Sequence, residues 1–235
     1  MNIAILNYCG LVGKTTLAAN LFVPRMPGAK FIAIETINET AADLGLEIEM
    51  IKGGNFISLY KKLGQLSNII VDVGSSNVES FLAGLMRFED AHEDVDYFVV
   101  PTLSGSREQK ETIKTIKLLA GLGVPAKKIR ILFNVVEEDV KEEFRHVLDH
   151  VKTTKSAIAN ENCGIYRSEV YDLLNAQEIT LPVALADTKD YKAMVRNETL
   201  DEATFDYYSN MRAIKSLSPQ ANENLDNVFK NLFKG

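Results

Sequence analysis

The chain has 235 residues, of which 46% are hydrophobic and 25% charged, and its formal net charge is −6. These totals are typical of a soluble globular protein with one α/β domain and argue against a disordered chain. The negative charge gives no general attraction to nucleic acid. Two cysteines, Cys9 and Cys163, are too few for a disulfide framework, and no apolar stretch is long enough to span a bilayer. With no signal-peptide pattern at the start, a cytoplasmic protein with free thiols is expected.

Short apolar runs alternate with helical periodicity along the first half of the chain. The runs are typical of buried strands, and the intervening apolar residues recur at helical spacing. Pro24 is expected to end the first helix. Strands are predicted at Ile3–Leu6, Phe31–Ile34 and Ile69–Val71, and helices at Thr15–Phe22, 56–63 and 78–86.

The second half continues the alternation and ends in helical patterns. Strands are predicted at Tyr97–Val100, Ile129–Phe133 and Leu181–Leu185, helices at 113–119, 140–151, 169–174, 205–214 and 225–233, and a linker at Ser216–Asn224. The alternation predicts an α/β fold with three layers, in which a mostly parallel twisted sheet has helices on both faces. Residues 1–218 are predicted to form this domain and residues 219–235 a C-terminal amphipathic helix. Ligands of such sheets bind at the carboxyl ends of the strands.

The segment Tyr8–Thr16 follows the first predicted strand and precedes the first predicted helix. A phosphate-binding loop needs glycines that let backbone N–H groups turn inward, a lysine for the β and γ phosphates, and a hydroxyl group for Mg²⁺. Gly10, Gly13, Lys14 and Thr15 match these requirements. The helix that follows adds its positive end to the same site.

One position departs from the full phosphate-loop pattern, because Tyr8 stands where the first glycine is expected. A chance Gly-Lys-Thr in a strand-to-helix turn is the alternative. The position of the segment argues against chance, and so does Asp72, which ends a later apolar strand. An aspartate there is the usual partner of Mg²⁺ in this class of nucleoside triphosphate-binding proteins.

Three stretches of the sequence resemble one family. NYCGLVGKTTLAANL resembles the deviant phosphate loop of ParA/MinD-type ATPases, and IIVDVGSS and DYFVVPTLSGS resemble later strands of the same P-loop NTPase fold. With PRMPGAKFIAIETIN, the loop most resembles Stb-type plasmid-stability ATPases. The resemblance covers residues 1–135 well and becomes thin beyond about Asn160.

The resemblance implies an ATP-driven switch in plasmid partition or stability. Members bind Mg²⁺ and ATP as a face-to-face homodimer, hydrolyse ATP slowly and respond to a partner. The implied partners here are a DNA-binding adaptor protein and non-specific DNA. The implied ATP-binding residues are Cys9, Gly10, Leu11, Val12, Gly13, Lys14, Thr15, Thr16, Asn134 and Asp187. Thr15 and Asp72 would hold Mg²⁺, and Asn134 and Asp187 would lie near the adenine.

Two positions depart from the family. The family's lysine that crosses the dimer to the partner's nucleotide falls on Cys9, so one stabiliser of transition-state charge is missing. Arg25 and Lys30 are candidate replacements. The family's water-orienting aspartate falls on Ile37 or Asn38, with Glu35 and Glu39 as alternatives. Lys14, Asn38 and Asp72 are therefore the predicted catalytic residues, and slow turnover is expected.

Three weaker signals have two interpretations each. Cys9 is either a redox control point, with its thiol pKa lowered by a helix N-terminus, or a small residue that fits the loop. Lys110, Lys114 and Lys117 recur along one helix face, as a phosphate-contacting stripe or as ordinary solvated lysines. The helix Leu225–Phe233 either docks on the domain or, as the weaker alternative, contacts a membrane.

Two other functions compete with the partition switch. One is a nucleotide-binding scaffold that changes shape with little hydrolysis, which Cys9 and Asn38 favour. The other is a small-molecule kinase or ligase on the same fold, which would need an acceptor pocket. The sequence shows no arginine- or histidine-rich loop for such a pocket.

Overall fold

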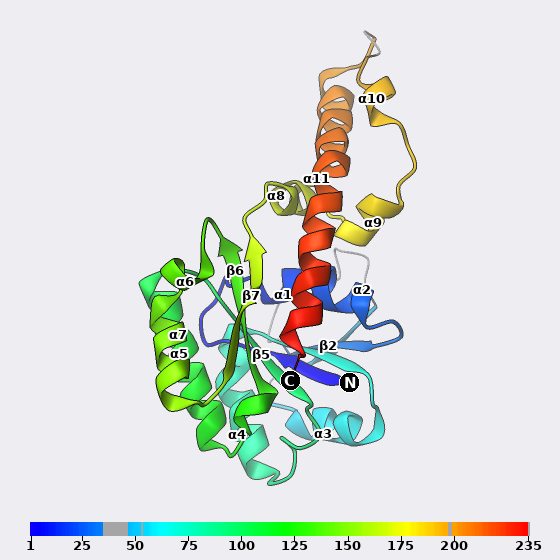
Figure 1. Cartoon of the computed structure of the whole chain (residues 1–235). Helices are drawn as coiled ribbons and strands as arrows, with labels where there is room; N and C mark the ends of the chain where they lie inside the picture. Colours follow the sequence, from blue (N-terminus) through cyan, green and yellow to red (C-terminus); the bar gives the residue numbers. More distant parts are fainter. Residues whose placement is uncertain (35–46, 53, 197–198, 235) are drawn as a thin grey trace.

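A computed structural model describes residues 1–34, 47–52, 54–196 and 199–234, and its centre is a seven-stranded sheet. The strand order is β3-β2-β4-β1-β5-β6-β7, and every neighbouring pair is parallel. Figure 1 shows the strands and their covering helices. The strands are β1 (Asn2–Ile5), β2 (Lys30–Ile34), β3 (Ile48–Ile51), β4 (Ile69–Val73), β5 (Tyr97–Thr102), β6 (Ile129–Val136) and β7 (Ile158–Tyr166).

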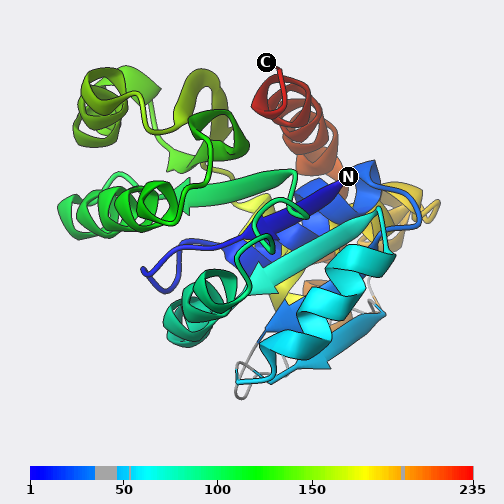
Figure 2. The same ribbon diagram turned by 90° about the horizontal axis from the view of Figure 1, so that it is seen from below.

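Helices cover both faces of the sheet, as the view from below shows (Figure 2). One face carries α3 (Phe56–Gln65), α4 (Val78–Arg87), α5 (Ser106–Gly121), α6 (Val140–Glu143) and α7 (Arg145–Thr154). The other carries α1 (Lys14–Leu17), η1 (Ala18–Phe22), α2 (Val23–Arg25), α8 (Val170–Ala176), α9 (Leu181–Ala186) and α11 (Glu202–Leu232). Three short helices complete the described chain: η2 (Ser75–Asn77), η3 (Ala126–Lys128) and α10 (Tyr191–Met194). The predicted three-layer α/β fold is confirmed.

The central strand β1 shows how the sequence divides between two cores. Side chains alternate across a strand, so Ile3 and Ile5 pack into the core under α11, while Ala4 and Leu6 pack into the core under α4 and α5. All four are fully buried. A strand buried on both faces reads as a continuous apolar run, which is why β1 was predictable.

Three strand assignments differ from the sequence analysis. Both edge strands, β3 and β7, escaped prediction. The side chains of residues 48–50 in β3 and of residues 158–162 in β7 are all exposed or half-buried, so neither strand gives a buried apolar run. The predicted strand Leu181–Leu185 is the helix α9. Pro182 lies in its first turn, where a missing N–H costs nothing. The Leu181 N–H donates to Asn20 Oδ1 at 2.7 Å, which fixes the start of α9.

The predicted linker at Ser216–Asn224 is wrong, because α11 continues through it with Pro219 inside the helix. The polar residues that suggested a linker make tertiary contacts. Asn224 Nδ2 donates to the Gly164 carbonyl at 3.0 Å, and Asn224 Oδ1 accepts from the Tyr166 N–H at 3.1 Å. Asn224 thereby covers backbone groups of the edge strand β7. The boundary predicted at residues 218/219 falls inside this one helix.

The C-terminal half of α11 packs its apolar face on the domain. Leu225, Val228 and Leu232 are buried, and Phe229 and Phe233 contact the ring of Phe22. The N-terminal half extends beyond the sheet beside α10 (Figure 1). The face considered for membrane contact is therefore part of the core. Among the described residues, no helix combines the length and hydropathy that crossing a bilayer requires.

The first helix runs past its predicted end, through η1 and α2 to Arg25. Pro24 has no N–H and cannot donate to the Asn20 carbonyl one turn earlier. The Arg25 guanidinium replaces that donor, with Nη1 at 3.0 Å from Asn20 O and 3.2 Å from Leu21 O. The π-helical segment η1 lies at this proline, where a regular ladder is interrupted.

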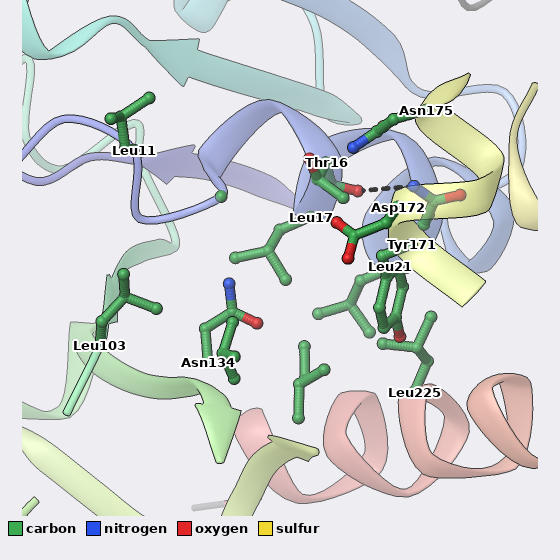
Figure 3. A pocket seen from close by; sticks show the side chains of 14 residues that line it. Leu11, Thr16, Leu17, Leu21, Leu103, Asn134, Tyr171, Asp172, Asn175 and Leu225 are labelled. Atoms are coloured by element: carbon green, nitrogen blue, oxygen red, sulfur yellow. Dashed lines mark hydrogen bonds between the residues drawn. The ribbon is translucent and has the colours of Figure 1, made fainter. Parts of the chain in front are cut away.

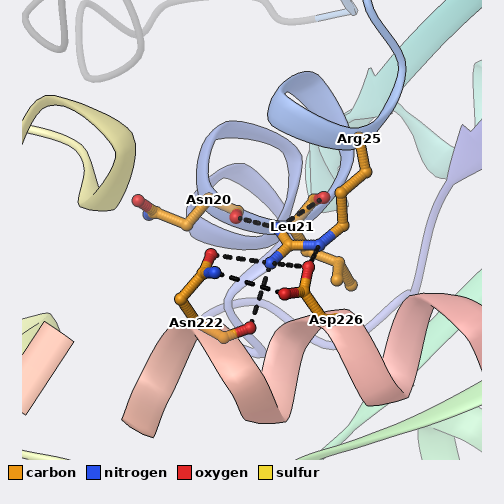
Figure 4. Close-up of polar contacts among 5 residues, drawn as sticks. All are labelled: Asn20, Leu21, Arg25, Asn222 and Asp226. Carbon is orange, nitrogen blue, oxygen red and sulfur yellow. Dashed lines mark hydrogen bonds and ion pairs between the residues drawn. The ribbon is translucent and has the colours of Figure 1, made fainter. Parts of the chain in front are cut away.

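Arg25 also joins this helix to α11 (Figure 4). Its Nε lies 2.9 Å from Asp226 Oδ1, and its Nη2 donates to Asn222 Oδ1 at 2.8 Å. The Arg25 side chain is only 10% exposed. One guanidinium therefore donates to helix carbonyls near Pro24, where a backbone N–H donor is missing, and fixes the position of α11.

We expect Arg25→Ala to lower the free energy of unfolding by about 2–4 kcal/mol, because buried carbonyl and amide groups lose their donor. Asp226→Asn removes one half-exposed charge and should cost less than about 1 kcal/mol. Urea denaturation measures both. Lys30→Ala, at an exposed cation, is the control and should change stability by less than about 0.5 kcal/mol. Equal small effects for all three variants would show that Arg25 does not join the helices.

Candidate nucleotide-binding site

The candidate phosphate loop, Tyr8–Thr16, is preceded by Asn7, which lies two residues beyond the end of β1. Asn7 is fully buried, and its Nδ2 donates to Pro101 O at 2.7 Å and to Thr112 Oγ1 at 2.8 Å. Its Oδ1 accepts from the Cys9 N–H at 2.9 Å and from Thr115 Oγ1 at 3.3 Å. These bonds attach the loop to β5 and α5. Asn7 was not predicted as a site residue, and its polar side chain at the end of an apolar strand is the sequence signal for it.

The loop turns into the helix at Gly13, which has φ +84° and ψ 21°. A Cβ on Gly13 would lie 2.6 Å from Asn134 Nδ2, so both the backbone conformation and the close neighbour require glycine. Asn134 Nδ2 donates to Val12 O at 3.0 Å and holds the loop from β6. Leu11, at φ 59°, is 98% exposed at the tip of the loop.

Lys14 and Thr15 follow the turn, and each side chain forms a hydrogen bond with a different partner. Lys14 is buried, and its Nζ donates across the loop to Cys9 O at 3.1 Å. The Thr15 hydroxyl donates to Asp72 Oδ2 at 2.7 Å. Asp72 is 2% exposed at the carboxyl end of β4. The structure thus brings together the lysine, the hydroxyl and the carboxylate that the sequence analysis assigned to phosphate and metal binding.

The Thr15–Asp72 pair suits Mg²⁺ held jointly with a nucleotide. Hydroxyl and carboxylate oxygens are hard ligands, and Mg²⁺ is commonly held by one or two protein groups together with phosphates and water. Within the described ranges, no group of three or more His, Cys, Asp or Glu side chains could hold a metal by itself. Mg²⁺ bound here would neutralise phosphate charge, while Lys14 and the backbone N–H groups of the loop would bind the phosphates.

A cavity of about 260 Å³ adjoins the loop on the side of α8 (Figure 3). Its polar groups come from three elements, with Asn134 on β6, Thr16 and Asn20 on the first helix, and Asp172 and Asn175 on α8. The remaining lining residues are Leu11, Gly13, Leu17, Leu21, Leu103, Val135, Ile165, Tyr171 and Leu225. An apolar cavity with a few polar groups is what a nucleoside needs beside a phosphate loop.

The hydroxyl of Tyr171 lies at the α11 side of this cavity, toward Leu225 (Figure 3). It is buried and has no hydrogen-bond partner in the described part of the chain. Burial raises the pKa of Tyr171 to about 12, so the hydroxyl keeps its proton at neutral pH. Tyr171, Asp172 and Asn175 were not predicted, because the resemblance is thin in this region and α8 carries no motif.

One predicted site residue, Asp187, lies apart from this group, and another, Asn38, falls outside the residues that the structure describes. Asp187 is not in the cavity lining; it follows α9, and its carboxylate accepts from Tyr191 Oη at 2.6 Å and from the Lys189 N–H at 2.9 Å. The Tyr191 hydrogen bond lowers the pKa of Asp187. Its expected place near the adenine assumed that Leu181–Leu185 is a strand, which is wrong. Asn38, with its alternatives Glu35, Ile37 and Glu39, lies outside the described residues.

Cys9 and the candidate replacement cations show how the loop departs from the family. Burial raises the pKa of the Cys9 thiol, which favours the interpretation of Cys9 as a small residue that fits the loop over that of a redox control point. Arg25 is occupied by α11, and Lys30 is exposed at the amino end of β2, away from the loop. Neither cation lies at the phosphate loop within this chain.

No protein-family model matches the sequence, and no curated protein matches it. Solved structures match over nearly the whole chain. Apo McdA from Cyanothece has a TM-score of 0.58 at 14% identity, covering 99% of both chains. An alanine-substituted Cyanothece McdA in complex with ATP has a TM-score of 0.54 at 15% identity, covering 99% of this chain and 96% of that one.

A third solved structure extends the likeness to a cell-division protein. MinD from Aquifex aeolicus has a TM-score of 0.51 at 14% identity, covering 93% of this chain and 94% of that one. At such identities the likeness concerns the fold. The chain therefore has the fold of ParA/MinD-type P-loop ATPases.

We expect Gly13→Ala to lower the free energy of unfolding by about 1–3 kcal/mol, because alanine must adopt a left-handed conformation and displace Asn134. Gly10→Ala is the matched control within the loop. Its Cβ would meet Ser75 Oγ at 3.4 Å, an ordinary contact, so stability should change by less than about 1 kcal/mol. Denaturant unfolding without nucleotide measures both variants. Equal losses would contradict the special role of Gly13.

Proposed function

We propose that the protein is an ATP-dependent molecular switch of the ParA/MinD type, acting in plasmid partition or stability. It binds Mg²⁺ and ATP at the loop Tyr8–Thr16, forms a homodimer when ATP is bound and hydrolyses ATP slowly. Its partners are a DNA-binding adaptor protein and, as a further candidate, non-specific DNA. The likeness to Stb-type ATPases in the loop and in residues 24–38 supports the partition role.

The observation that carries this proposal is the arrangement around the first helix. Thr15 and Asp72 are in contact at 2.7 Å, and Lys14 is held across the loop by Cys9 O. A chance Gly-Lys-Thr turn would not place a buried carboxylate from another strand on the threonine hydroxyl. The adjoining cavity supplies room for a nucleoside.

A nucleotide-binding scaffold with little hydrolysis is the second candidate, and Cys9 is the observation that favours it. Cations accelerate phosphoryl transfer, because they neutralise the charge that develops at the γ phosphate. In this chain Cys9 supplies a buried, neutral thiol at the family's lysine position. Both candidates share ATP binding and differ in turnover.

ATP hydrolysis by the wild type and by Lys14→Ala, each with and without duplex DNA, tests the proposal. A switch should turn over more slowly than about one ATP per second, at the low end of enzyme rates, and DNA should raise the rate. Lys14→Ala should reduce turnover to background, because the γ phosphate loses its cation. Lys127→Ala, at an exposed lysine on η3, is the control and should leave the rate unchanged. ATP binding without turnover in every condition would favour the scaffold instead.

Replacing the thiol by a cation tests the importance of Cys9. We expect Cys9→Lys to raise the hydrolysis rate by about tenfold or more, since one preorganised charge contributes on the order of 2–4 kcal/mol at a transition state. Cys9→Ser is the matched control, because it keeps the size and neutrality of the side chain. An unchanged rate in Cys9→Lys, with ATP still bound, would show that position 9 does not limit turnover.

A further inference from the structure

The outer face of α5 carries an open hollow between three lysines, the α5 groove, and all of its lining residues lie on this one helix. Lys110, Lys114 and Lys117 are exposed at i, i+4 and i+7, and they line an open hollow of about 510 Å³ together with Ile113 and Leu118. Leu118 is 39% exposed and Ile113 is half-buried. The groove therefore combines an apolar floor with a cationic rim.

The rim lysines differ in their present contacts. Lys114 lies 3.8 Å from a Glu111 carboxylate oxygen and 4.3 Å from the centre of the Tyr8 ring. Within the described residues, neither Lys110 nor Lys117 forms an ion pair. Two cations thus flank the apolar floor without a carboxylate partner, and the third is held by contacts that solvent weakens.

This combination fits an acidic amphipathic protein segment better than nucleic acid. Such a segment can place apolar side chains on Ile113 and Leu118 and carboxylates on the lysines, as helices do when they dock in grooves. A DNA backbone offers phosphates but no apolar side chains for the floor. The net charge of −6 and the neighbouring Glu111 also reduce the attraction of this face for a polyanion.

The opposite face of the same helix holds the phosphate loop. Thr112 and Thr115 contact Asn7, and the Tyr8 N–H donates to Thr115 Oγ1 at 3.3 Å. Lys114 lies between the two faces, because it reaches from the groove to the Tyr8 ring. An occupant of the groove therefore lies one helix thickness from the start of the phosphate loop.

We propose that the groove of α5, bounded by Lys110, Lys114 and Lys117, docks an acidic amphipathic segment of a partner protein. The proposal specifies the chemistry of the partner. It rests on the proposed switch function only where it identifies this partner as the adaptor protein. Its test runs without nucleotide, so the failure of ATP binding and the failure of docking are separate results.

Fluorescence anisotropy of labelled probes measures the docking. The probe is a synthetic helical peptide of leucine and glutamate, compared with a version in which glutamine replaces glutamate, a version in which serine replaces leucine, and short duplex DNA. We expect the acidic amphipathic peptide to bind the wild type about tenfold more tightly than either altered peptide or DNA, a difference that two or three paired charges can supply.

Two variants locate the binding on α5. Lys110→Glu/Lys117→Glu and, separately, Leu118→Ser should each weaken peptide binding by about tenfold. Lys127→Glu/Lys192→Glu makes the same charge change at exposed lysines of η3 and α10 and should leave binding unchanged. All variants change exposed side chains, and matching thermal unfolding curves confirm that they fold. Equal weakening in both double variants, equal binding of the glutamine peptide, or tighter binding of DNA than of the peptide would overturn the proposal.

Discussion

The left-handed turn at Gly13 is the constraint on which the geometry of the candidate site depends. The Asn134 amide from β6 lies where a Cβ on residue 13 would be, and it holds the Val12 carbonyl. The turn therefore brings β6 against the loop and starts the helix in the same step. Lys14 then lies under the loop on Cys9 O, and Thr15 faces Asp72 on β4. A single backbone conformation thereby brings groups that follow or lie on β1, β4 and β6 together at the candidate site.

The rest of the fold stabilises this turn from two sides. On one side, α5 holds Asn7 through Thr112 and Thr115, which fixes the start of the loop. On the other, Arg25 connects the end of the first helix to α11. These two helices, α5 and α11, belong to different cores of the domain.

The sequence predicted the centre of the molecule better than its edges. Strands buried on both faces, such as β1 and β4, are continuous apolar runs, and the residues at their carboxyl ends could be assigned to the site from order alone. Edge strands expose much of their surface, so β7 gives no such run. The short apolar run 181–185 was ambiguous between strand and helix, and Pro182 starts a helix there. The assignment of Asp187 depended on that strand.

Other features were missed because their physical cause lies far away in the sequence. Asn222 and Asn224 looked like linker residues, yet they contact Arg25 and the backbone of β7. The cavity residues Tyr171 and Asp172 carry no local motif, and the fold alone brings them beside the loop. The contact between Thr15 and Asp72 was predictable, because Thr15 follows the first strand and Asp72 ends a later one in a recognisable order.

The Mg²⁺ dependence of ATP affinity tests the central claim most directly. Isothermal titration of ATP into the wild type and into Thr15→Ala, each with Mg²⁺ and with a chelator, measures it. The account predicts that Mg²⁺ tightens ATP binding by about tenfold or more in the wild type and has little effect in Thr15→Ala, where the hydroxyl ligand is missing. Equal affinity in all four titrations, or no ATP binding by the wild type, would contradict a phosphate loop at Tyr8–Thr16.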